Sequence, residues 1–253
     1  MTDRVALVTG GAKRIGRAIA LDLARHGWAV AIHHHSSAAE AETLAGEIAA
    51  AGGRAVTLAG DLSREAESSA LLPRAAAALG PVTCLVNNAS VFEMDKIDTV
   101  TRESWDRHIE TNLRAPLVLS QAFARQLPDA ADGNIVNLLD QRVWKLTPYF
   151  LSYTVAKSGL WILTQTLALA LAPRIRVYGI GPGPTLPSAR QTVEQFQQQQ
   201  AAVPLRRGPT PEEIAATLRF ILATPSMTGQ MIALDGGEHL GWAQPGRGFV
   251  ARE

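Results

Sequence analysis

The stretch RVALVTGGAKRIGRAIALDLARHGWAVAIHH, residues 4–34, decides the fold. Two apolar runs with β-branched residues, RVALVTG and AVAIHH, enclose an alanine- and leucine-rich segment with helical periodicity. The runs are typical of strands, and the segment between them is typical of a helix. The same alternation continues through AEAETLAGEIAAAG and RAVTLAG as far as MIALDGG. It predicts repeated β-α-β units and therefore a parallel sheet.

Length and composition indicate one domain. The chain has 253 residues, of which 47% are hydrophobic and 19% are charged, and this balance suits one α/β domain with a large core. Neither an internal repeat nor a linker rich in Gly and Ser divides it. Seven strand-like runs alternate with helix-like segments, so we expect an α/β fold, a single Rossmann-type doubly wound parallel sheet of seven strands flanked by helices. This domain is expected to span residues 1–253.

Charge and apolar patterning narrow the class of function. The formal net charge is +1 and the basic residues are scattered, which favours neither a nucleic acid nor a membrane surface as partner. The chain starts without a leader-like segment and has no apolar run of bilayer thickness, so we expect a cytoplasmic protein. Its one cysteine, Cys84, lies in the apolar run VTCLV and is expected to pack as a small hydrophobe. Chemistry on a small molecule is therefore favoured.

A glycine-rich turn follows the first expected strand. Gly10 and Gly16 flank this turn in TGGAKRIG, where backbone amides and a helix N-terminus cradle a pyrophosphate in dinucleotide-binding domains. A tight turn built of small residues is the alternative. The other motifs described below disfavour that alternative, so we predict a dinucleotide site at this turn.

The end of the second expected strand indicates which nicotinamide cofactor binds. Sites for NAD usually present an acidic residue there to the ribose 2′-hydroxyl. This chain has HHHSS at residues 33–37 and no carboxylate. Arg14, inside the glycine-rich turn, is expected to reach a 2′-phosphate, with His35 and Ser37 adding hydrogen bonds. We therefore predict NADPH/NADP+ as the cofactor.

The three consecutive histidines do not predict a metal site. Neighbouring residues on a strand point to opposite faces, so at most His33 and His35 share a side. No Cys, Asp or Glu lies close enough in the sequence to complete a ligand shell. We expect polar residues at a strand end beside an anion, and no metal.

A second stretch, DQRVWKLTPYFLSYTVAK at residues 140–157, carries the expected chemistry. On a helix, Tyr153 and Lys157 are four residues apart and share a face. The lysine ammonium is therefore expected near the phenol, where charge attraction favours the phenolate. Tyrosine then serves as a proton donor or acceptor near neutral pH, and Asp140 adds a carboxylate 13 residues earlier. This set is typical of a reductase, with Asp140 as its unusual member.

Together these motifs resemble the short-chain dehydrogenase/reductase family over nearly the whole chain. The family pattern of TGxxxGxG, NNAG, a catalytic Asn, Ser, YxxxK and a PG turn appears here as TGGAKRIG, NNAS, Asn112, Asp140, YTVAK and GPG. Arg14 replaces the middle glycine and Asp140 replaces the serine. Both departures resemble the pteridine reductase branch, as do HHHSSAAEA and NNASVF. Ser36 stands where that branch commonly carries an arginine, so cofactor affinity is expected to depend more on Arg14.

The resemblance implies a reaction. Hydride would pass from NADPH to a C=N carbon of a dihydropterin such as dihydrobiopterin, dihydromonapterin or dihydrofolate, giving the tetrahydro form. Tyr153 would deliver the proton and Asp140 would support it through a hydrogen bond. Lys157 would hold the nicotinamide ribose hydroxyls, and Asn112 would keep a water relay behind Lys157. A fully oxidised pterin would be reduced by the same groups.

The resemblance also implies binding residues. Phe92 follows NNASV, where pteridine reductases place an aromatic that sandwiches the pterin against the nicotinamide, although a core role is the alternative. Ser90 would face the cofactor phosphates or the pterin edge, and Arg14 would touch both phosphate and substrate. The implied substrate-binding residues are Arg14, Ser90, Phe92, Asp140 and Tyr153. The implied cofactor-binding residues are Gly10, Lys13, Arg14, Ile15, Gly16, His35, Ser36, Ser37, Asp61, Leu62, Asn88, Ala89, Ser90, Lys157, Pro182, Gly183 and Thr185.

Asp140 bears on the choice between substrates. In a ketone-reducing relative a serine hydroxyl donates to the substrate carbonyl, whereas an ionised aspartate does the reverse. Asp140 therefore favours a substrate with N–H groups or with a ring nitrogen to protonate, as a pterin has. Two alternatives stay open, namely a ketoreductase of acyl thioesters or sugars and a binding protein that senses NADP without turnover. Asp140 is also open to being a turn or helix-cap residue.

Two surface features predict an assembly and a lid. The segment SGLWILTQTLALALA, residues 158–172, is apolar nearly all round, which indicates that a second subunit covers part of it. The resemblance implies a homotetramer. The loop GPGPTLP and the glutamine-rich segment after it predict a substrate lid at about residues 184–205. The preferred pterin and the role of the C-terminal tail stay open.

Overall fold

The computed structural model describes residues 4–188 and 190–241. Their seven strands are parallel and form one sheet in the order β3-β2-β1-β4-β5-β6-β7, which confirms the expected doubly wound α/β fold. The strands are β1 (Val5–Val8), β2 (Ala29–His34), β3 (Ala55–Ala59), β4 (Cys84–Asn87), β5 (Gly133–Leu138), β6 (Ile175–Pro182) and β7 (Met231–Leu234).

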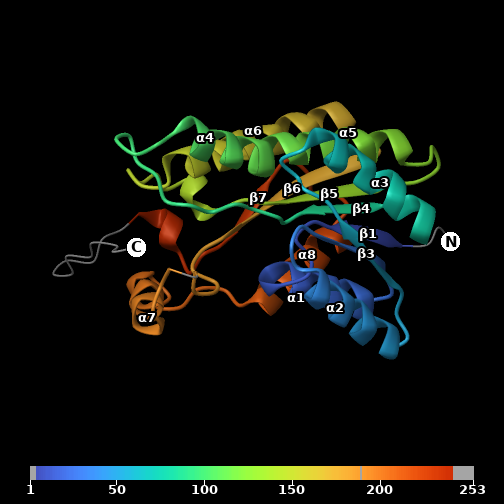
Figure 1. The fold of residues 1–253 in the computed structure, drawn as a ribbon, viewed down its shortest axis with the longest axis horizontal. Coiled ribbons are helices and arrows are strands. Elements are labelled where there is room, and N and C mark those ends of the chain that lie inside the picture. The colour runs from blue at the N-terminus through green and yellow to red at the C-terminus, as the bar shows by residue number, and fades with distance from the viewer. Residues whose placement is uncertain (1–3, 189, 242–253) are drawn as a thin grey trace.

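Helices cover both faces of this sheet (Figure 1). One layer contains α1 (Arg14–Arg25), α2 (Ala38–Ala50) and α8 (Pro211–Ala223). The opposite layer contains α3 (Glu65–Leu79), α4 (Arg102–Ile109), α5 (Ala115–Gln126) and α6 (Leu151–Leu171), with a π-helical turn at Glu110–Arg114 between α4 and α5. The remaining helix, α7 (Val193–Ala202), stands apart from both layers.

Each face of the sheet packs into its own apolar cluster. In β1, Val5 and Leu7 belong to the cluster with α3 and α5, whereas Ala6 and Val8 belong to the cluster with α1 and α8. All four side chains are fully buried. Because successive residues of a strand point to opposite faces and both faces are covered, the strand needs apolar residues at every position. This explains the continuous apolar runs in the sequence.

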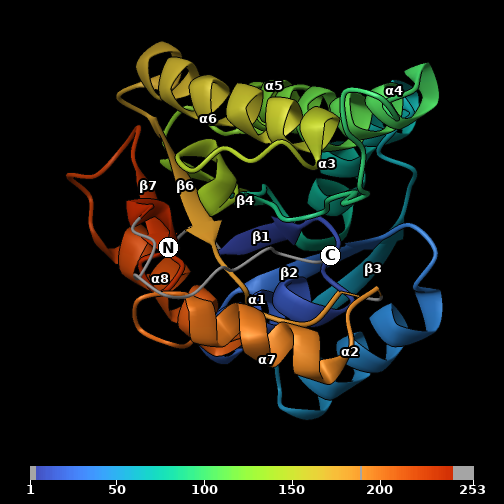
Figure 2. The same ribbon diagram turned by 90° about the vertical axis from the view of Figure 1, so that its left-hand side faces the viewer.

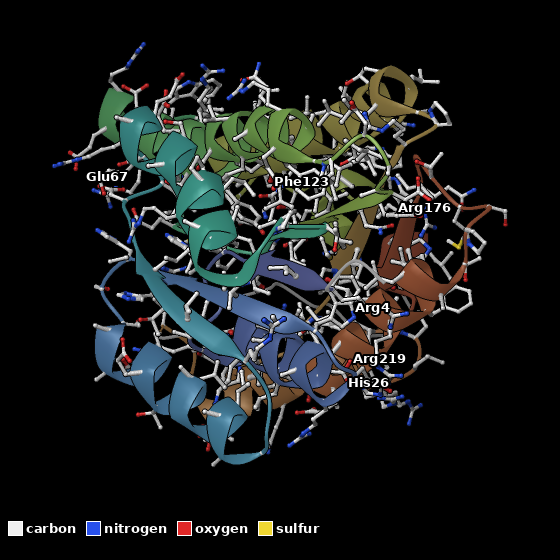
Figure 3. All side chains as sticks on the ribbon, turned by 90° about the vertical axis from the view of Figure 1, so that its right-hand side faces the viewer. Arg4, His26, Glu67, Phe123, Arg176 and Arg219 are labelled. Carbon is white, nitrogen blue, oxygen red and sulfur yellow. The ribbon has the colours of Figure 1, made fainter. Side chains whose placement is uncertain are left out.

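Packing between α5 and the sheet leaves no room for a larger residue at Gly133. Phe123 of α5 is fully buried in this layer (Figure 3). A Cβ atom added at Gly133, the first residue of β5, would lie 2.8 Å from the Phe123 ring. Side chains in protein interiors are close-packed, so this contact would force the ring or the strand to move. Gly133 thus lets α5 lie close on β5, the strand that leads to Asp140.

The strand order changes direction between β1 and β4, which are neighbours in the sheet. Ligands of doubly wound sheets bind at the carboxyl ends of the strands beside such a switch point. The glycine-rich turn follows β1, the NNAS motif begins at the end of β4, Asp140 follows β5, and the GPG turn ends β6. The expected motifs therefore gather at one edge of the sheet, which Figure 2 views from its side of the molecule.

Helix α6 has one buried and one exposed face. Leu160, Thr164 and Ala168 are buried against the sheet side, whereas Ile162 is 61% exposed and Leu169 is 83% exposed. The outer face therefore presents large apolar side chains, in line with the apolar pattern of the sequence. Among the described helices, none combines the length and the hydropathy needed to cross a membrane.

Candidate active site

Two neighbouring pockets open at the carboxyl edge of the sheet. One lies over the glycine-rich turn and the other over Asp140 and Tyr153. Arg14, Ile15 and Ser90 line both pockets, so the two are continuous with each other. We name them the cofactor pocket and the substrate pocket.

Glycines shape the floor of the cofactor pocket. Gly10 has φ +58°, a backbone conformation that favours glycine. A Cβ atom at Gly16 would lie 2.2 Å from the carbonyl oxygen of Gly10, so a side chain is excluded there. The N-cap of α1 is Lys13, which makes no side-chain capping bond, and the first turn contains no acidic residue. The backbone N–H groups of this helix end are thus suited to an anion such as a pyrophosphate.

Asn88 joins the turn after β1 to the end of β4. Its side-chain Nδ2 donates to the carbonyl oxygens of Thr9 at 2.9 Å and Gly10 at 3.1 Å. The Thr9 hydroxyl in turn accepts from the backbone N–H groups of Asn88 and Ala89. Asn88 and Ala89 line the cofactor pocket as the sequence predicted. Thr9 supports both strand ends, a role that was not predicted.

His33 accepts a hydrogen bond from the backbone of the glycine-rich turn. The Gly10 N–H donates to His33 Nδ1 at 3.1 Å, and His33 Nε2 lies 3.0 Å from the carbonyl oxygen of Gly60. Since a carbonyl only accepts, the ring proton lies on Nε2 and the imidazole is neutral. Burial is the main cause that lowers the pKa of His33 to about 4. His33 is thus structural, and the described residues contain no cluster of three or more His, Cys, Asp or Glu that could hold a metal ion.

Most predicted cofactor residues line these two pockets, but two serines do not. The chain leaves the sheet after His34, and the exposed Ser36 and the partly buried Ser37 stand before α2 without facing either pocket. Lys13 forms an ion pair of 2.5 Å with Glu40 of α2. The cofactor residues that do line a pocket are Gly10, Lys13, Arg14, Ile15, Gly16, His35, Asp61, Leu62, Asn88, Ala89, Ser90, Lys157, Pro182, Gly183 and Thr185.

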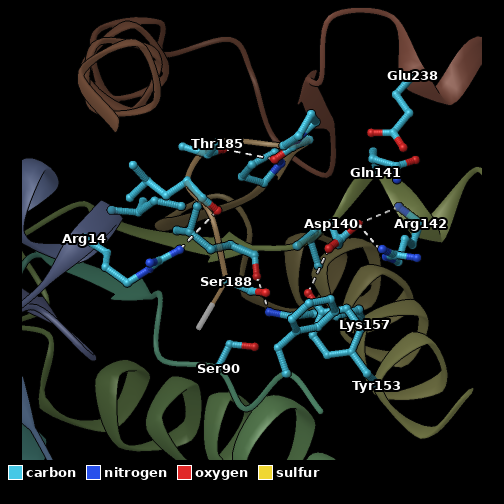
Figure 4. Close-up of a pocket in the computed structure, with 18 of the residues that line it drawn as sticks. Arg14, Ser90, Asp140, Gln141, Arg142, Tyr153, Lys157, Thr185, Ser188 and Glu238 are labelled. Atoms are coloured by element: carbon cyan, nitrogen blue, oxygen red, sulfur yellow. Dashed lines mark hydrogen bonds and ion pairs between the residues drawn. The ribbon is translucent and has the colours of Figure 1, made fainter. Parts of the chain in front are cut away.

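Asp140 and Tyr153 form the centre of the substrate pocket (Figure 4). The Tyr153 hydroxyl donates to Asp140 Oδ2 at 2.9 Å. The other carboxylate oxygen, Oδ1, accepts from the backbone N–H of Arg142 at 2.8 Å and lies 4.0 Å from its Nε. The same carboxylate therefore caps the short turn Gln141–Val143 and accepts the hydrogen bond of the phenol. Asp140 is thus both a cap residue and a residue of the pocket.

The expected phenolate is not favoured in this arrangement. Burial raises the pKa of Tyr153 well above its ordinary value, and the negative charge of Asp140 raises it further. Arg142 and the Ser90 hydroxyl act in the opposite sense without reversing the shift. The prediction that Lys157 would make Tyr153 readily ionised is therefore wrong, because a buried phenol beside a carboxylate keeps its proton. Tyr153 is arranged as a proton donor.

Lys157 points past the phenol toward the sheet. Its Nζ donates to the carbonyl oxygen of Leu138, the last residue of β5, at 2.6 Å and lies 5.8 Å from the centre of the Tyr153 ring. Lys157 is buried, and this burial lowers its pKa to about 8. The two residues do share one face of α6, as their spacing predicted, but the structure contains no direct bond between the ammonium and the phenol hydroxyl.

Asn112 holds a loop rather than facing either pocket. It lies in the π-helical turn, where its Nδ2 donates to the carbonyl oxygen of Val91 and its Oδ1 accepts from the Val91 N–H, both at 2.8 Å. Both polar atoms of the amide are thus used. A water relay behind Lys157 would have to use the main chain of Asn112, because the side chain fixes the segment between Ser90 and Phe92.

Phe92 lines the substrate pocket, but one face of its ring is already covered. The ring stacks on Phe150 with centroids 4.3 Å apart and meets Tyr153 edge-on at 4.7 Å. The guanidinium carbons of Arg142 and Arg190 lie 5.7 Å and 5.6 Å from its centre. Phe92 therefore packs against Phe150 with one face of its ring and also lines the pocket. A flat substrate would have a single face of the ring to stack on.

The predicted lid region meets the site through two arginines. Arg14 donates to the carbonyl oxygens of Leu186 at 3.3 Å and Pro187 at 2.9 Å. From the lid side, Arg190 donates to the carbonyl oxygen of Phe92 at 2.9 Å. Helix α7 follows this loop and places side chains at the mouth of the substrate pocket.

Among the described residues, three polar residues of the substrate pocket that lie outside the predicted lid were not predicted from the sequence. Gln141 and Arg142 follow Asp140 directly, and Glu238 comes from the short turn Glu238–Leu240 after β7. Burial is the largest of the causes that raise the pKa of Glu238 to about 7. No local pattern marks Glu238, because its position in the pocket depends on β7 lying beside β6 in the sheet.

A buried network supports the start of α6 beneath the phenol. The Glu93 N–H donates to His108 Nε2 at 3.1 Å, so His108 Nδ1 carries the ring proton and lies 2.7 Å from the Ser152 hydroxyl oxygen. The Ser152 hydroxyl donates to Asp95, whose other oxygen accepts from the Ser152 N–H at 3.1 Å. His108, Ser152 and Asp95 are all buried, and Ser152 directly precedes Tyr153.

The fold and these motifs define an oxidoreductase class. The family model described as short chain dehydrogenase matches residues 4–198, and the chain belongs to this family. Among solved structures, FolM alternative dihydrofolate reductase 1 from Brucella suis, in complex with NADP, is 49% identical, with a TM-score of 0.93 over 96% of this chain and 98% of that chain. The family expected from the sequence is confirmed, and this likeness agrees with the expected pteridine reductase branch.

Other relatives carry different descriptions. An uncharacterized oxidoreductase of Methylorubrum extorquens is 34% identical over 245 residues, covering 94% of this chain and 98% of that protein. A 3-oxoacyl-[acyl-carrier-protein] reductase of Synechocystis is 30% identical over 246 residues, covering 94% of this chain and 97% of that protein. The similar proteins therefore include one described as a 3-oxoacyl-[acyl-carrier-protein] reductase as well as one described as an alternative dihydrofolate reductase.

Proposed function

We propose that this chain is an NADPH-dependent reductase of a C=N bond in pterins, converting a dihydropterin or dihydrofolate to its tetrahydro form. The observation that carries the proposal is the hydrogen bond from the Tyr153 hydroxyl to Asp140 at 2.9 Å. A carboxylate at this place repels the negative charge that develops on a ketone oxygen, whereas it accepts from the N–H groups of a pterin. The likeness to the Brucella suis protein supports the same substrate class.

The cofactor pocket fits a dinucleotide phosphate. The uncapped N-terminus of α1 and the glycines of the turn are suited to binding a pyrophosphate. Lys13 and Arg14 supply positive charge beside it. Bound NADPH supplies the hydride. Arg14 and His35 are the residues of this pocket that we assign to the 2′-phosphate, since Ser36 and Ser37 lie outside it.

The chain's own groups divide the remaining work. Tyr153 is held protonated by burial and by Asp140 and donates its proton to the substrate nitrogen. Lys157, buried beside the phenol, supplies positive charge that offsets the phenolate left behind. Phe92 offers one ring face for stacking, and Arg190 holds the lid region, about residues 184–205, against the loop that carries Phe92.

The direct test follows the loss of NADPH absorbance with purified protein and separate substrates. Dihydrobiopterin, dihydromonapterin and dihydrofolate should each be compared with an acetoacetyl thioester. Turnover of a pterin but not of the thioester is expected. Turnover of the thioester alone would move the protein to the ketoreductases, and tight NADPH binding without turnover of any of these substrates would favour the sensor alternative.

Asp140 provides the matching mutational prediction. Asp140→Ser should reduce kcat for pterin reduction by orders of magnitude, because the serine hydroxyl neither carries negative charge nor holds the Tyr153 proton as Asp140 does. Val193→Ser, on the lid helix outside the pocket, is the control and should keep the activity. An unchanged kcat in Asp140→Ser would contradict the proposed role.

A further inference from the structure

A second carboxylate stands in the substrate pocket without a part in the proposed reaction. Glu238 follows β7, and its backbone N–H donates to the carbonyl oxygen of Asp235 at 3.2 Å. Within the described residues, its carboxylate accepts no hydrogen bond and forms no ion pair within 4.0 Å. The carboxylate is nevertheless partly buried and lines the pocket beside Gln141 and Arg142. Because this carboxylate is only partly buried and has no protein partner among the described residues, it is available to a ligand in the pocket.

The position of Glu238 indicates which part of a ligand it meets. Figure 4 shows Arg14 and Glu238 on opposite sides of Asp140, with the Glu238 side chain directed toward Gln141. Arg14 belongs to the border with the cofactor pocket, and Asp140 with Tyr153 marks the reacting centre. A substrate ring that reacts at Tyr153 therefore lies between the cofactor and the Glu238 side. The substituent that extends away from the cofactor is the part that reaches Glu238.

We infer that Glu238 determines specificity for the substrate's side chain, accepting hydrogen bonds from hydroxyl groups of a neutral side chain and repelling a carboxylate-bearing one. The inference rests on the proposed function and deepens it, because pterins differ in this substituent. A carboxylate is an acceptor-only group that binds hydroxyl donors through charge-assisted hydrogen bonds. Towards the carboxylates of a folate, which lie beyond its p-aminobenzoyl group, it acts as a like charge.

The cations near Glu238 allow its effect on substrate affinity to be measured separately from theirs. Two cations face it, Lys145 and Arg142, and either one would attract a carboxylate-bearing substituent. Neutralising Glu238 removes the negative charge that opposes these two cations. Affinity for an anionic substituent should therefore rise. Affinity for a hydroxylated substituent should fall, because a neutral group is a weaker hydrogen-bond acceptor. The charged or titratable groups that face or adjoin Glu238 are Lys145, Arg142, Asp140, Asp235 and His239.

The test compares substrates in one variant. Glu238→Gln keeps the size of the side chain and removes its charge. KM should be measured for a dihydropterin with a hydroxylated side chain and for dihydrofolate, whose side chain ends in carboxylates. At pH 8, where Glu238 of wild type is ionised, we expect the ratio of the dihydrofolate KM to the hydroxylated-dihydropterin KM to fall about tenfold in Glu238→Gln. The matched control is Glu212→Gln, an equal change of charge on an exposed residue of α8 outside the lid region, which should leave the ratio as in wild type.

The pH profile provides a second readout. The pKa of Glu238 is raised to about 7, so the group is neutral below this pH and negative above it. The carboxylates of dihydrofolate stay ionised from pH 6 to 9, since ordinary carboxyl pKa values are about 4. The KM ratio of wild type should therefore rise with pH through about 7, and the ratio of Glu238→Gln should stay flat there.

The outcomes separate this inference from the proposed function. Wild-type protein that reduces no pterin would overturn the proposed function itself. Pterin turnover with the same KM ratio and the same pH profile in wild type and Glu238→Gln would overturn the role of Glu238 alone. A tenfold fall of the ratio in Glu238→Gln, absent in Glu212→Gln, supports both.

Discussion

Tyr153 and its two ionisable neighbours show how position changes the chemistry of a residue. The prediction that Tyr153 and Lys157 share one face of a helix is confirmed, whereas the prediction that Lys157 favours the phenolate is wrong. Asp140, which comes from the end of β5, binds the phenol, whereas Lys157 donates to the backbone of the same strand end. The phenol therefore keeps its proton in the structure, which suits a donor to a ring nitrogen.

His33 gives a prediction of pH-dependent stability. Its pKa is about 4 in the folded protein and 6.5 in its ordinary state, so the unfolded chain binds more protons between these values. The neutral imidazole therefore makes its full contribution to the free energy of unfolding above pH 6.5. This contribution is lost as the pH falls toward 4, by roughly 3 kcal/mol over the whole range. Urea unfolding across this range should show the loss.

A variant without the titrating group tests this prediction. His33→Gln should show a shallower rise of unfolding free energy between pH 4 and 6.5 than wild type, whatever its absolute stability. Parallel curves for the two proteins would mean that burial does not keep the pKa of His33 lowered in solution.

At the scale of elements, the first turn of α6 depends on residues from other parts of the chain. Ser152 is bound to Asp95 and His108, which lie on the segment after β4 and on α4. Helix α6 is 21 residues long, and its apolar pattern alone predicts a helix without fixing its start. The buried bonds to Ser152 set where the helix begins and hence where Tyr153 points.

Ser152→Ala tests this anchoring. The variant leaves the Nδ1–H of His108 and one Asp95 oxygen with fewer partners in a buried place, so the free energy of unfolding should fall by about 2 to 4 kcal/mol. Thr166→Ala, farther along α6 and exposed, also loses a hydroxyl bond to its own helix and should change stability by less than about 0.5 kcal/mol. Equal unfolding free energies for the two variants, measured in urea, would argue against the network.

At the scale of the whole molecule, the outer face of α6 is the main apolar surface of the helical layer that contains it. Val155, Ile162 and Leu169 are all exposed there. Large apolar side chains exposed on one face of a helix favour an assembly in which a second subunit covers that face. We propose that α6 packs against a second copy in a homo-oligomer, with a tetramer as the expected form.

A charge on this face should prevent assembly. Ile162→Glu would bury a carboxylate in an apolar interface, so its mass by light scattering at micromolar concentration should fall to that of a smaller species. Gln165→Glu adds the same charge on the same helix and should assemble more readily, because Gln165 is already polar and exposed. A monomeric wild type, or Ile162→Glu assembled as wild type is, would exclude this surface as the interface.

The amino acid sequence by itself determined the α/β class, the seven parallel strands and the family, because apolar periodicity and short motifs such as TGGAKRIG and YTVAK act locally. It also predicted most of the pocket-lining residues, since the strand ends of a doubly wound sheet meet at one edge. The positions of Ser36, Ser37 and Asn112 outside the pockets, and of Glu238 inside, needed the tertiary structure. Which proton each group holds was likewise decided only by tertiary structure, because burial and neighbouring charge from distant segments shift pKa values that the residue type alone leaves ordinary.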